Sequence, residues 1–575
     1  MKTKQSIINL LAVTILFVIA NKSFSQNPLF IPPTLSGTNF NLTVQADSTE
    51  FFAGYQTPTY GVNGNILGPT LIFNKGDNVT LNVTNNIPPV TTMHWHGLHV
   101  PAHADGGPHQ MIMPGATWSP SFTVMNDAAT YWYHPHGQNR TDIQVTKGLA
   151  GLIIIRDSIE AGLNLPRTYG IDDIPLIVQT KCFDVLYQTA IATMFDTVPM
   201  VNATIDPFIN APAQIVRLRL LDGASDRSFL FGFSNNMTFY QIASDGGLVR
   251  SPIAMNRLQL SPGERAEILI DLTGMQGQTI SLMNYGSGLP DGIIGAQNVG
   301  NGMSQIPDYN LNFLNGADFD LLQINVIAQT VNPVTTIPTS LVNFQPFDST
   351  LINRTRELVF APQTMGPMEM VEGPFTINGH QFSMDTINDT TYLNHVEKWI
   401  LTNNTLIAHP FHIHDVQFYV TDINGVAVPV SDQVKKDVVL VMPNESVSFI
   451  TKFEDFADTI PYMYHCHLLH HEDDGMMGSF VVLPGTSNIE IGDNNDRVLE
   501  CSPNPVSSFV RIGIRGFEKE TKYSLFNTSN QTVLSNKIND NSSEISIDLS
   551  SLGSGIYILK VSDKDKTQYC KIIKL

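Results

Sequence analysis

The sequence is poor in cysteine and in positive charge. Its 575 residues include 4 cysteines, and 52 aspartates and glutamates outnumber 32 lysines and arginines, which gives a net charge of -20. So few cysteines exclude a fold that depends on a framework of disulfides. The acidic balance argues against a nucleic-acid-binding protein, because phosphate binding requires clustered lysine and arginine.

Long hydrophobic runs are also lacking, except at the start. Lys2 and Lys4 precede an apolar run over residues 7–20, and small residues follow at Ser23 and Ser25. This is the pattern of a secretory signal peptide, which we assign to residues 1–25. The alternative is a membrane anchor, but the run is shorter than the roughly 20 apolar residues that span a bilayer. We therefore expect an exported protein.

Long helical periodicity is absent, and short alternating runs take its place. Residues 78–84 and 214–221 are examples, and glycine, proline and asparagine separate such runs. This pattern predicts β-sandwiches. We predict an all-β protein with three related sandwich domains at 27–158, 167–330 and 347–486, followed by a small β-sandwich without histidine at 498–575.

One short stretch concentrates metal-binding side chains. Its potential ligands are His465, Cys466, His467, His470, His471, Met476 and Met477. Two histidines, one cysteine and a distant methionine form the ligand set of a blue-copper site, and His409 offers the further histidine. On a strand, successive side chains point to opposite faces. Cys466 would then face one metal while His465 and His467 face a second centre.

Eight of the 16 histidines form four His-X-His pairs, each in a sequence that resembles a strand end. They are His94 and His96, His134 and His136, His412 and His414, and His465 and His467. Eight imidazoles divide as two, three and three, which would serve three clustered copper ions. Two pairs belong to the first sandwich and two to the third, so the cluster would lie between those domains. The remaining histidines, apart from His409 and His471, we take as ordinary residues.

These four patches resemble those of the multicopper oxidases, in particular the bacterial three-domain laccases and cuprous oxidases. The resemblance covers roughly residues 27–484 and includes residues 243–247 and 262–265. It implies cupredoxin-like Greek-key domains, four copper ions, and four one-electron oxidations coupled to the reduction of dioxygen to two waters. It also implies a monomer.

The resemblance assigns ligands by position. His409, Cys466 and His471 would be the equatorial ligands of a type 1 copper, with Met476 axial. His94 and His412 would hold a type 2 copper. The type 3 pair would be held by His96, His134, His136, His414, His465 and His467. Spacing from the cysteine favours His471 over His470 and Met476 over Met477, and both alternatives stay open here.

Two acidic residues match those that deliver protons in the bacterial enzymes. They are Asp105, beside two glycines, and Glu472, beside the predicted ligand His471. Together with Cys466 they are the residues we expect to take part in catalysis. The simpler alternatives are a turn-forming aspartate and a solvated glutamate.

The reducing substrate stays open among phenols, Cu(I), Fe(II) and Mn(II). Met365, Met368 and Met370 lie where cuprous oxidases carry a methionine-rich insert, but this segment is much shorter. Thioethers favour Cu(I), whereas loop packing explains flexible apolar side chains equally well. A copper nitrite reductase has no use for two full type 3 pairs. A non-enzymatic relative of the cell-division type usually lacks copper ligands, and none is missing here.

The C-terminal region, residues 498–575, has Pro503, Asn504 and Pro505 near its start, the segment Gly555-Ile556-Tyr557 in an alternating run, and a basic end over 571–574. With these features it resembles the sorting domains of type IX secretion. This implies a passage through the periplasm and then release outside the cell or attachment to its surface; the alternative is a small adhesive domain that stays in place. Cys501 and Cys570 bracket the region and could form a disulfide in an oxidising compartment, although the sequence leaves this open. For Cys182 we expect a buried free thiol.

Overall fold

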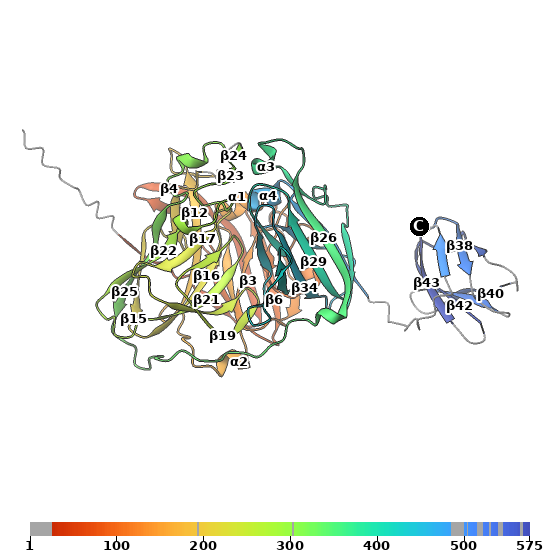
Figure 1. The fold of residues 1–575 in the computed structure, drawn as a ribbon, viewed down its shortest axis with the longest axis horizontal. Helices are drawn as coiled ribbons and strands as arrows, with labels where there is room; N and C mark the ends of the chain where they lie inside the picture. Colours follow the sequence, from red (N-terminus) through yellow and green to blue (C-terminus); the bar gives the residue numbers. More distant parts are fainter. Residues whose placement is uncertain are drawn as a thin grey trace, which may run out of the picture. The chain divides into compact units, whose positions relative to one another are not determined.

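The computed structural model divides into two compact units, Met1–Gly485 and Thr486–Leu575. It describes residues 26–575 except 192–194, 302–303, 485–498, 503, 515–520, 528–530, 539–543 and 564–566. The predicted signal peptide, residues 1–25, lies outside the described residues. Within them, no helix has both the length and the apolar character needed to cross a membrane. The first unit consists of three β-sandwiches, as predicted (Figure 1).

The N-terminal sandwich packs two sheets around one apolar core. The first sheet has the order β2 (Thr34–Ser36), β5 (Thr70–Asn74), β11 (Gly151–Arg156), β10 (Ala129–His134) and β7 (His94–His96). The second has the order β4 (Tyr55–Val62), β3 (Asn39–Phe52), β6 (Asn78–Asn86) and β8 (Thr117–Trp118), and β9 (Ser121–Thr123) also pairs with β6. Alternation makes this core: Val79, Leu81 and Val83 of β6 are buried and the residues between them are not.

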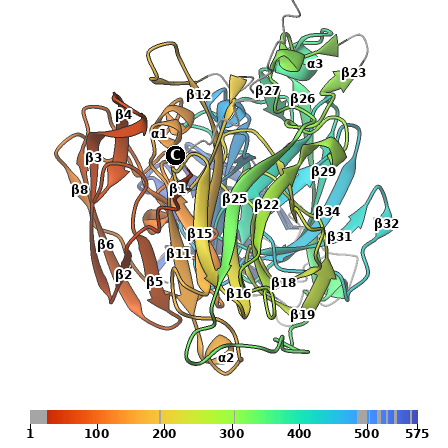
Figure 2. The same cartoon turned by 90° about the vertical axis from the view of Figure 1, so that its left-hand side faces the viewer.

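The middle sandwich is built in the same way. One sheet runs β1 (Asn27–Pro28), β15 (Pro207–Pro212), β25 (Asp318–Ile327), β22 (Thr279–Tyr285), β17 (Phe229–Phe233) and β20 (Leu258–Leu260). The other runs β13 (Thr189–Ala190), β12 (Asp173–Phe183), β16 (Ile215–Asp222), β21 (Arg265–Asp271), β18 (Phe239–Ser244) and β19 (Gly247–Met255), with β14 (Val198–Val201) on β12. Figure 2 shows β15, β25 and β22 side by side.

The third sandwich holds most of the predicted metal ligands. Its first sheet runs β27 (Phe375–Ile377), β26 (Ile352–Pro362), β29 (Val396–Asn403), β34 (Ser446–Lys452), β31 (Phe418–Ile423) and β32 (Val426–Ala427). Its second runs β28 (Asp389–Tyr392), β36 (Met477–Leu483), β35 (Tyr462–Cys466), β30 (His409–Ile413) and β33 (Val438–Val441). The second sheet places the cysteine patch beside the His412 pair, because β30 and β35 are hydrogen-bonded neighbours.

Short helices and a small hairpin complete the first unit. The helices are α1 (Thr141–Thr146), α2 (Ser158–Ala161), α3 (Glu369–Glu372) and α4 (Leu469–Asp473), and β23 (Gly300–Asn301) pairs with β24 (Ser304–Gln305). The 3-10 turns are Ala102–Ala104, Gly286–Gly288, Tyr309–Leu311 and Ser349–Leu351. Helices α1 and α4 pack against each other (Figure 1), so the N-terminal and third sandwiches meet next to the cysteine patch.

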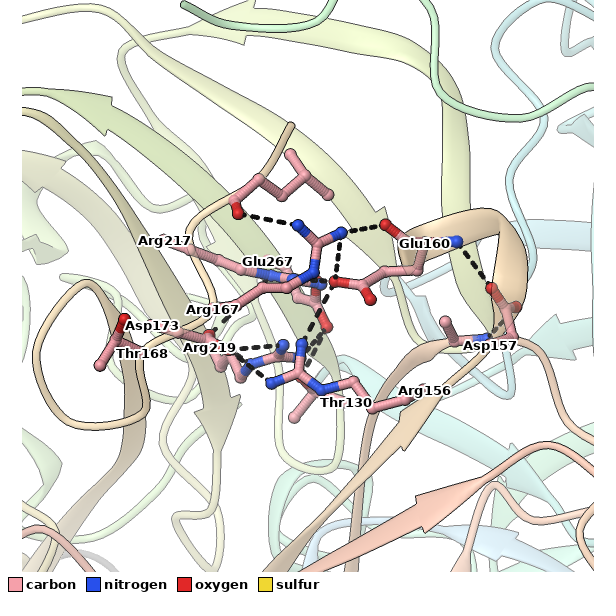
Figure 3. Close-up of polar contacts among 12 residues, drawn as sticks. Thr130, Arg156, Asp157, Glu160, Arg167, Thr168, Asp173, Arg217, Arg219 and Glu267 are labelled. Carbon is pink, nitrogen blue, oxygen red and sulfur yellow. Dashed lines mark hydrogen bonds and ion pairs between the residues drawn. The ribbon is translucent and has the colours of Figure 1, made fainter. Parts of the chain in front are cut away.

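A buried network of charges joins the N-terminal and middle sandwiches (Figure 3). Val216, Leu218 and Leu220 of β16 face the core, so the alternate residues Arg217 and Arg219 face the other way. That face does not meet water. Arg219 donates to Thr130 of β10 at 2.9 Å and to Glu267 of β21 at 2.6 Å. The polar face of an alternating strand here forms a contact between domains.

The second unit is a separate small sandwich. One sheet runs β37 (Leu499–Ser502), β38 (Phe509–Ile514) and β41 (Glu544–Asp548), and the other runs β40 (Thr532–Lys537), β39 (Lys522–Asn527), β42 (Gly555–Ser562) and β43 (Thr567–Lys574). Cys501 and Cys570 are bonded, as the sequence suggested.

The expectation of a buried thiol at Cys182 was wrong. Cys182 is free, but it is only half-buried. It is the next-to-last residue of β12, whose first nine residues are buried and whose last two, Cys182 and Phe183, are half-buried.

Candidate metal centre

The first cluster of donors surrounds Cys466 at the end of β35. The Cys466 Sγ atom lies 3.5 Å from Nδ1 of His409 and 3.6 Å from Nδ1 of His471. Thr405 Oγ1 lies 2.9 Å from Nε2 of His409, which leaves Nδ1 of that ring directed at the sulfur. The rings of His409 and His471 both pack on Phe375, with centroids 4.8 and 4.7 Å away. A thiol and two imidazoles thus converge in an apolar, buried pocket.

The structure distinguishes His471 from His470, and Met476 from Met477, as neighbours of the Cys466 thiol. His471 points at Cys466, whereas Nδ1 of His470 bonds the Asp226 carboxylate. Met476 packs in the same buried cluster as Cys466, whereas Met477 packs with Met463 and Phe382 in another. The geometry therefore favours His471 and Met476 at the thiol.

Burial sets the charge of this group. It lowers the pKa of His409 to about 3 and also lowers the pKa of His471, so both imidazoles are neutral and carry a lone pair. Burial also raises the pKa of the Cys466 thiol well above its usual value. A thiol in such surroundings ionises when a metal cation replaces its proton.

The second cluster contains the eight imidazoles of the four pairs. Pairing of β10 with β7 places His134 opposite His94, and pairing of β30 with β35 places His412 opposite His465. The potential ligand atoms lie within 4.8 Å of one another in three all-histidine groups: His94, His96 and His134; His94, His412 and His414; and His136, His414 and His465. The ring centroid of His467 is 5.0 Å from that of His96 and 5.5 Å from that of His134. The cluster lies between the N-terminal and third sandwiches.

The ring nitrogens of this cluster are arranged as metal ligands require. The Nδ1–H groups of His94 and His412 donate to the backbone oxygens of Asp105 and Asp437, at 3.0 and 2.8 Å. Their Nε2 atoms are buried and have no hydrogen-bond partner in the described part of the chain. Across the two sandwiches, Nε2 of His136 lies 3.1 Å from Nε2 of His465. Lone pairs that converge without proton donors fit bound metal ions, and imidazole with thiolate fits copper.

The two predicted acids each contact two of these histidines. Oδ2 of Asp105 accepts from Nδ1 of His414 at 2.7 Å, and Oδ1 lies 3.4 Å from Nδ1 of His94. The oxygens of Glu472 lie 3.2 Å from Nδ1 of His136 and 3.2 Å from Nδ1 of His465.

Their surroundings differ. Burial alone would raise the pKa of Asp105, but the imidazoles of His414 and His94 lower it below its usual range. Burial, and then the Asp473 carboxylate, raises the pKa of Glu472 well above its usual value. The neighbouring imidazoles thus favour the ionised form of Asp105, whereas burial favours the protonated form of Glu472.

Sequence reasoning missed Asp437 and the role of Arg265. Oδ1 of Asp437 lies 3.1 Å from Nε2 of His96, and both carboxylate oxygens accept from Arg265 at 2.6 Å. Arg265 lies in the segment 262–265 that is part of the family resemblance, whereas Asp437 belongs to none of the motifs identified in the sequence. No sequence signal could have found it.

A β-sandwich protein that joins a Cys/His/Met pocket to a buried cluster of eight imidazoles belongs to the class of copper-binding proteins. Two family models, both described as multicopper oxidase, match residues 43–160 and 352–486. A third, the secretion system C-terminal sorting domain, matches residues 501–575.

Known proteins agree with this assignment. The multicopper oxidase mco of Staphylococcus haemolyticus is 34% identical over 479 residues, 80% of this chain and 94% of that protein. The cell division protein FtsP of Sodalis glossinidius is 32% identical over 491 residues, 82% of this chain and 96% of that protein. The solved structure of the laccase-like multicopper oxidase CueO from Ochrobactrum sp. matches with a TM-score of 0.70 and 32% identity, over 79% of this chain and 100% of that one. The chain belongs to the multicopper oxidase family, which implies a copper-dependent oxidoreductase that uses dioxygen, and residues 501–575 form a secretion sorting domain.

Proposed function

We propose that the protein is a laccase-like multicopper oxidase that couples four one-electron oxidations of a reducing substrate to the reduction of dioxygen to two waters. One observation carries the proposal. Cys466 reaches a thiol-and-imidazole pocket, while the preceding residue of the chain, His465, reaches the histidine cluster. The two sets of ligands are therefore joined through a few covalent bonds of one strand.

The donor atoms support four copper ions. His409, Cys466, His471 and Met476 would hold the type 1 ion. His94 and His412 would hold the type 2 ion. The type 3 pair would be held by His96, His134, His136, His414, His465 and His467. Bound copper supplies the one-electron redox chemistry of the type 1 site and the reduction of dioxygen at the three-ion cluster.

The chain supplies the surroundings. All these side chains are buried, which excludes bulk water from both sites. Glu472 contacts Nδ1 of His136 and of His465 and is placed to hold a proton at the edge of the cluster, which it can regain through Thr141, whose hydroxyl donates to it at 2.6 Å. Asp105, ionised between His94 and His414, is placed to stabilise positive charge on their side of the cluster.

Oxygen uptake tests the proposal. We expect the copper-loaded protein to consume one dioxygen per four molecules of a one-electron phenolic donor, without releasing hydrogen peroxide. The Cys466→Ser variant is the control and should consume none. If the wild type binds copper at both sites but takes up no oxygen with phenols, Cu(I), Fe(II) or Mn(II), the protein has the non-enzymatic role that its similarity to a cell division protein would suggest.

Cuprous oxidase activity is the second candidate, and one contact favours it. The Met370 backbone oxygen, in α3, accepts from the Leu406 N–H at 2.9 Å, and Leu406 is next to Thr405, the partner of His409. The methionine segment therefore lies close to the Cys466 pocket. Met365 is 84% exposed and Met368 37% exposed, so thioethers are accessible there.

Replacing Met365, Met368 and Met370 with leucine separates the two substrates. A cuprous oxidase that uses these thioethers should lose Cu(I) oxidation and keep phenol oxidation. If both rates are unchanged, the segment is ordinary loop packing and the laccase-like assignment stands alone.

We further propose that the protein is a monomer exported through the periplasm and carried across the outer membrane by type IX secretion. The match of residues 501–575 to a sorting domain supports this route. Deleting residues 486–575 should leave active enzyme in the periplasm and none in the medium or on the cell surface. An unchanged distribution would contradict the route.

A further inference from the structure

The middle sandwich contributes none of the twelve predicted copper ligands, yet one of its strands reaches the histidine cluster. Arg265 begins β21 and is 1% exposed. Its two terminal nitrogens donate to the two carboxylate oxygens of Asp437, both at 2.6 Å. Asp437 directly precedes β33 of the third sandwich. This ion pair therefore joins the middle and third sandwiches beside the cluster.

Asp437 holds one ring from the N-terminal sandwich and one ring from its own, third sandwich. Its Oδ1 atom lies 3.1 Å from Nε2 of His96, and its backbone oxygen accepts from Nδ1–H of His412 at 2.8 Å. A carboxylate paired with a guanidinium accepts hydrogen bonds and donates none. Nε2 of His96 must then carry the ring proton, which leaves the lone pair on Nδ1. That Nδ1 atom is buried and has no hydrogen-bond partner among the described residues, as a metal ligand would.

The guanidinium of Arg265 is itself fully engaged. Besides Asp437, it donates to the backbone oxygens of Gly263 at 2.8 Å, Asp245 at 2.9 Å and Thr130 at 3.3 Å. These contacts use all five N–H groups that an arginine offers. A lysine has three, so it could keep the charge but not this arrangement.

The backbone of the N-terminal sandwich packs closely against one side of the pair. A Cβ atom at Gly97, next to His96, would lie 2.5 Å from Oδ2 of Asp437 and 2.7 Å from a terminal nitrogen of Arg265. Gly97 also has a φ of +83°, which glycine adopts without strain. The backbone at Gly97 therefore lies in close contact with both members of the ion pair.

We propose that Arg265 is a positioning residue of the histidine cluster, which through Asp437 fixes the tautomer of His96 and the ring orientations of His96 and His412. This inference rests on the ligand assignment of the proposed function. The alternative is that the pair only holds two sandwiches together. Arg217 offers the comparison: it is 1% exposed, lies in the same sheet, and pairs with Glu160 and Glu267 (Figure 3), but contacts no histidine in the described structure.

The test compares Arg265→Met and Arg265→Lys with Arg217→Met. Each purified apoprotein is titrated with copper against a chelator, and the copper bound per chain is measured together with the blue absorption of the Cys466 pocket. We expect both Arg265 variants to keep the blue absorption and to bind copper at the histidine cluster at least tenfold more weakly, as is typical for loss of an outer-shell partner. Arg217→Met should keep both.

Other outcomes would overturn the inference. Equal loss of cluster copper in Arg217→Met and Arg265→Met would show a general effect of a broken domain contact. Full copper binding in Arg265→Lys would show that charge suffices and the five-bond geometry does not matter. If Arg265→Met yields no folded protein, Arg265→Lys, which keeps the charge, decides. A wild type that binds no copper at the cluster would instead refute the proposed function.

Discussion

Cys466 and His465 are adjacent in the chain, and their side chains enter different ligand clusters. The Cys466 sulfur lies 3.5 Å from Nδ1 of His409, whereas Nε2 of His465 lies 3.1 Å from Nε2 of His136 in the N-terminal sandwich. The alternation of β35 produces this separation, and the register of β30 matches it, because Phe411 pairs with Cys466 and His412 with His465. One pair of strands therefore supports both centres.

Replacing Cys466 with serine should remove the copper of the Cys466 site and leave that of the histidine cluster in place. A serine hydroxyl is a poor ligand for copper compared with a thiolate. We expect the variant to lose its blue absorption and one copper per chain, to keep the copper of the histidine cluster, and to show only background oxygen uptake. Metal analysis and absorption spectra check this. Cys182→Ser is the control, since Cys182 is half-buried and remote in sequence from all ligands, and it should retain every copper.

Replacing Gly263 with alanine should disturb the histidine cluster through His467. A Cβ atom at Gly263 would lie 2.8 Å from the His467 ring, and neither ring nitrogen of His467 has a hydrogen-bond partner within the described chain. The ring is held by packing alone and would be displaced. We expect copper binding at the cluster to fall at least tenfold in a chelator titration.

The control for this variant is Gly274→Ala. Gly274 has a φ of +76° and Gly263 one of +87°, so both alanines carry the strain of a left-handed conformation, about 1–2 kcal/mol. No described atom lies within 4 Å of a Cβ at Gly274. Equal copper loss in the two variants would mean that backbone strain, and not contact with His467, is responsible.

Replacing Glu472 with glutamine should slow the oxygen half of the reaction. Glutamine keeps the shape of the side chain but cannot hold and release a proton at the edge of the cluster. We expect oxygen turnover to fall by about 10²–10⁴, the usual contribution of a general acid. Bleaching of the blue absorption by a phenol without oxygen should keep its rate, and stopped-flow spectroscopy separates the two. Asp474→Asn, an exposed change just after α4, is the control. Slower bleaching in Glu472→Gln would contradict the assignment.

Much of the fold and of the ligand set could be predicted from the sequence, because both depend on local spacing. Alternation in β6 predicted a strand with one buried face, and it has one. The His-X-His pairs sit at strand ends, where period two directs both imidazoles to one side. Strand alternation and His-X-His spacing each involve only a few neighbouring residues, so they can be recognised without knowledge of the tertiary structure.

Contacts between distant segments could not be predicted. The alternation of β16 would predict a solvent-exposed side chain at Arg217, but this face of the strand is buried and contacts the N-terminal sandwich through Thr130. Asp437 contacts His96 across 341 residues of sequence, and its role follows only from the packing of three sandwiches. The periodicity of the sequence therefore does not show which charged residues are buried in contacts between domains.

His99, which we took as an ordinary residue, should make stability depend on pH. Its Nδ1 atom lies 2.8 Å from the Asp415 carboxylate and its Nε2 atom 3.2 Å from that of Asp455. Burial alone would lower the pKa of His99, but these carboxylates outweigh it and raise the pKa to about 9. The pKa in the unfolded chain is about 6.5. The stabilisation is therefore complete below about pH 6.5 and is lost as the pH rises through 9.

The variant His99→Gln tests this in the copper-free protein. A shift of this size corresponds to at most about 3.5 kcal/mol. We expect the free energy of unfolding in urea to be lower than that of the wild type by up to this amount at pH 6, and equal to it near pH 10. His103→Gln is the control: its side chain is 58% exposed and lies 3.7 Å from Asp458, so its effect should stay within about 0.5 kcal/mol at both pH values. A loss in His99→Gln that is the same at pH 6 and pH 10 would show that the ring acts by packing, for example on Phe456, and not by its charge.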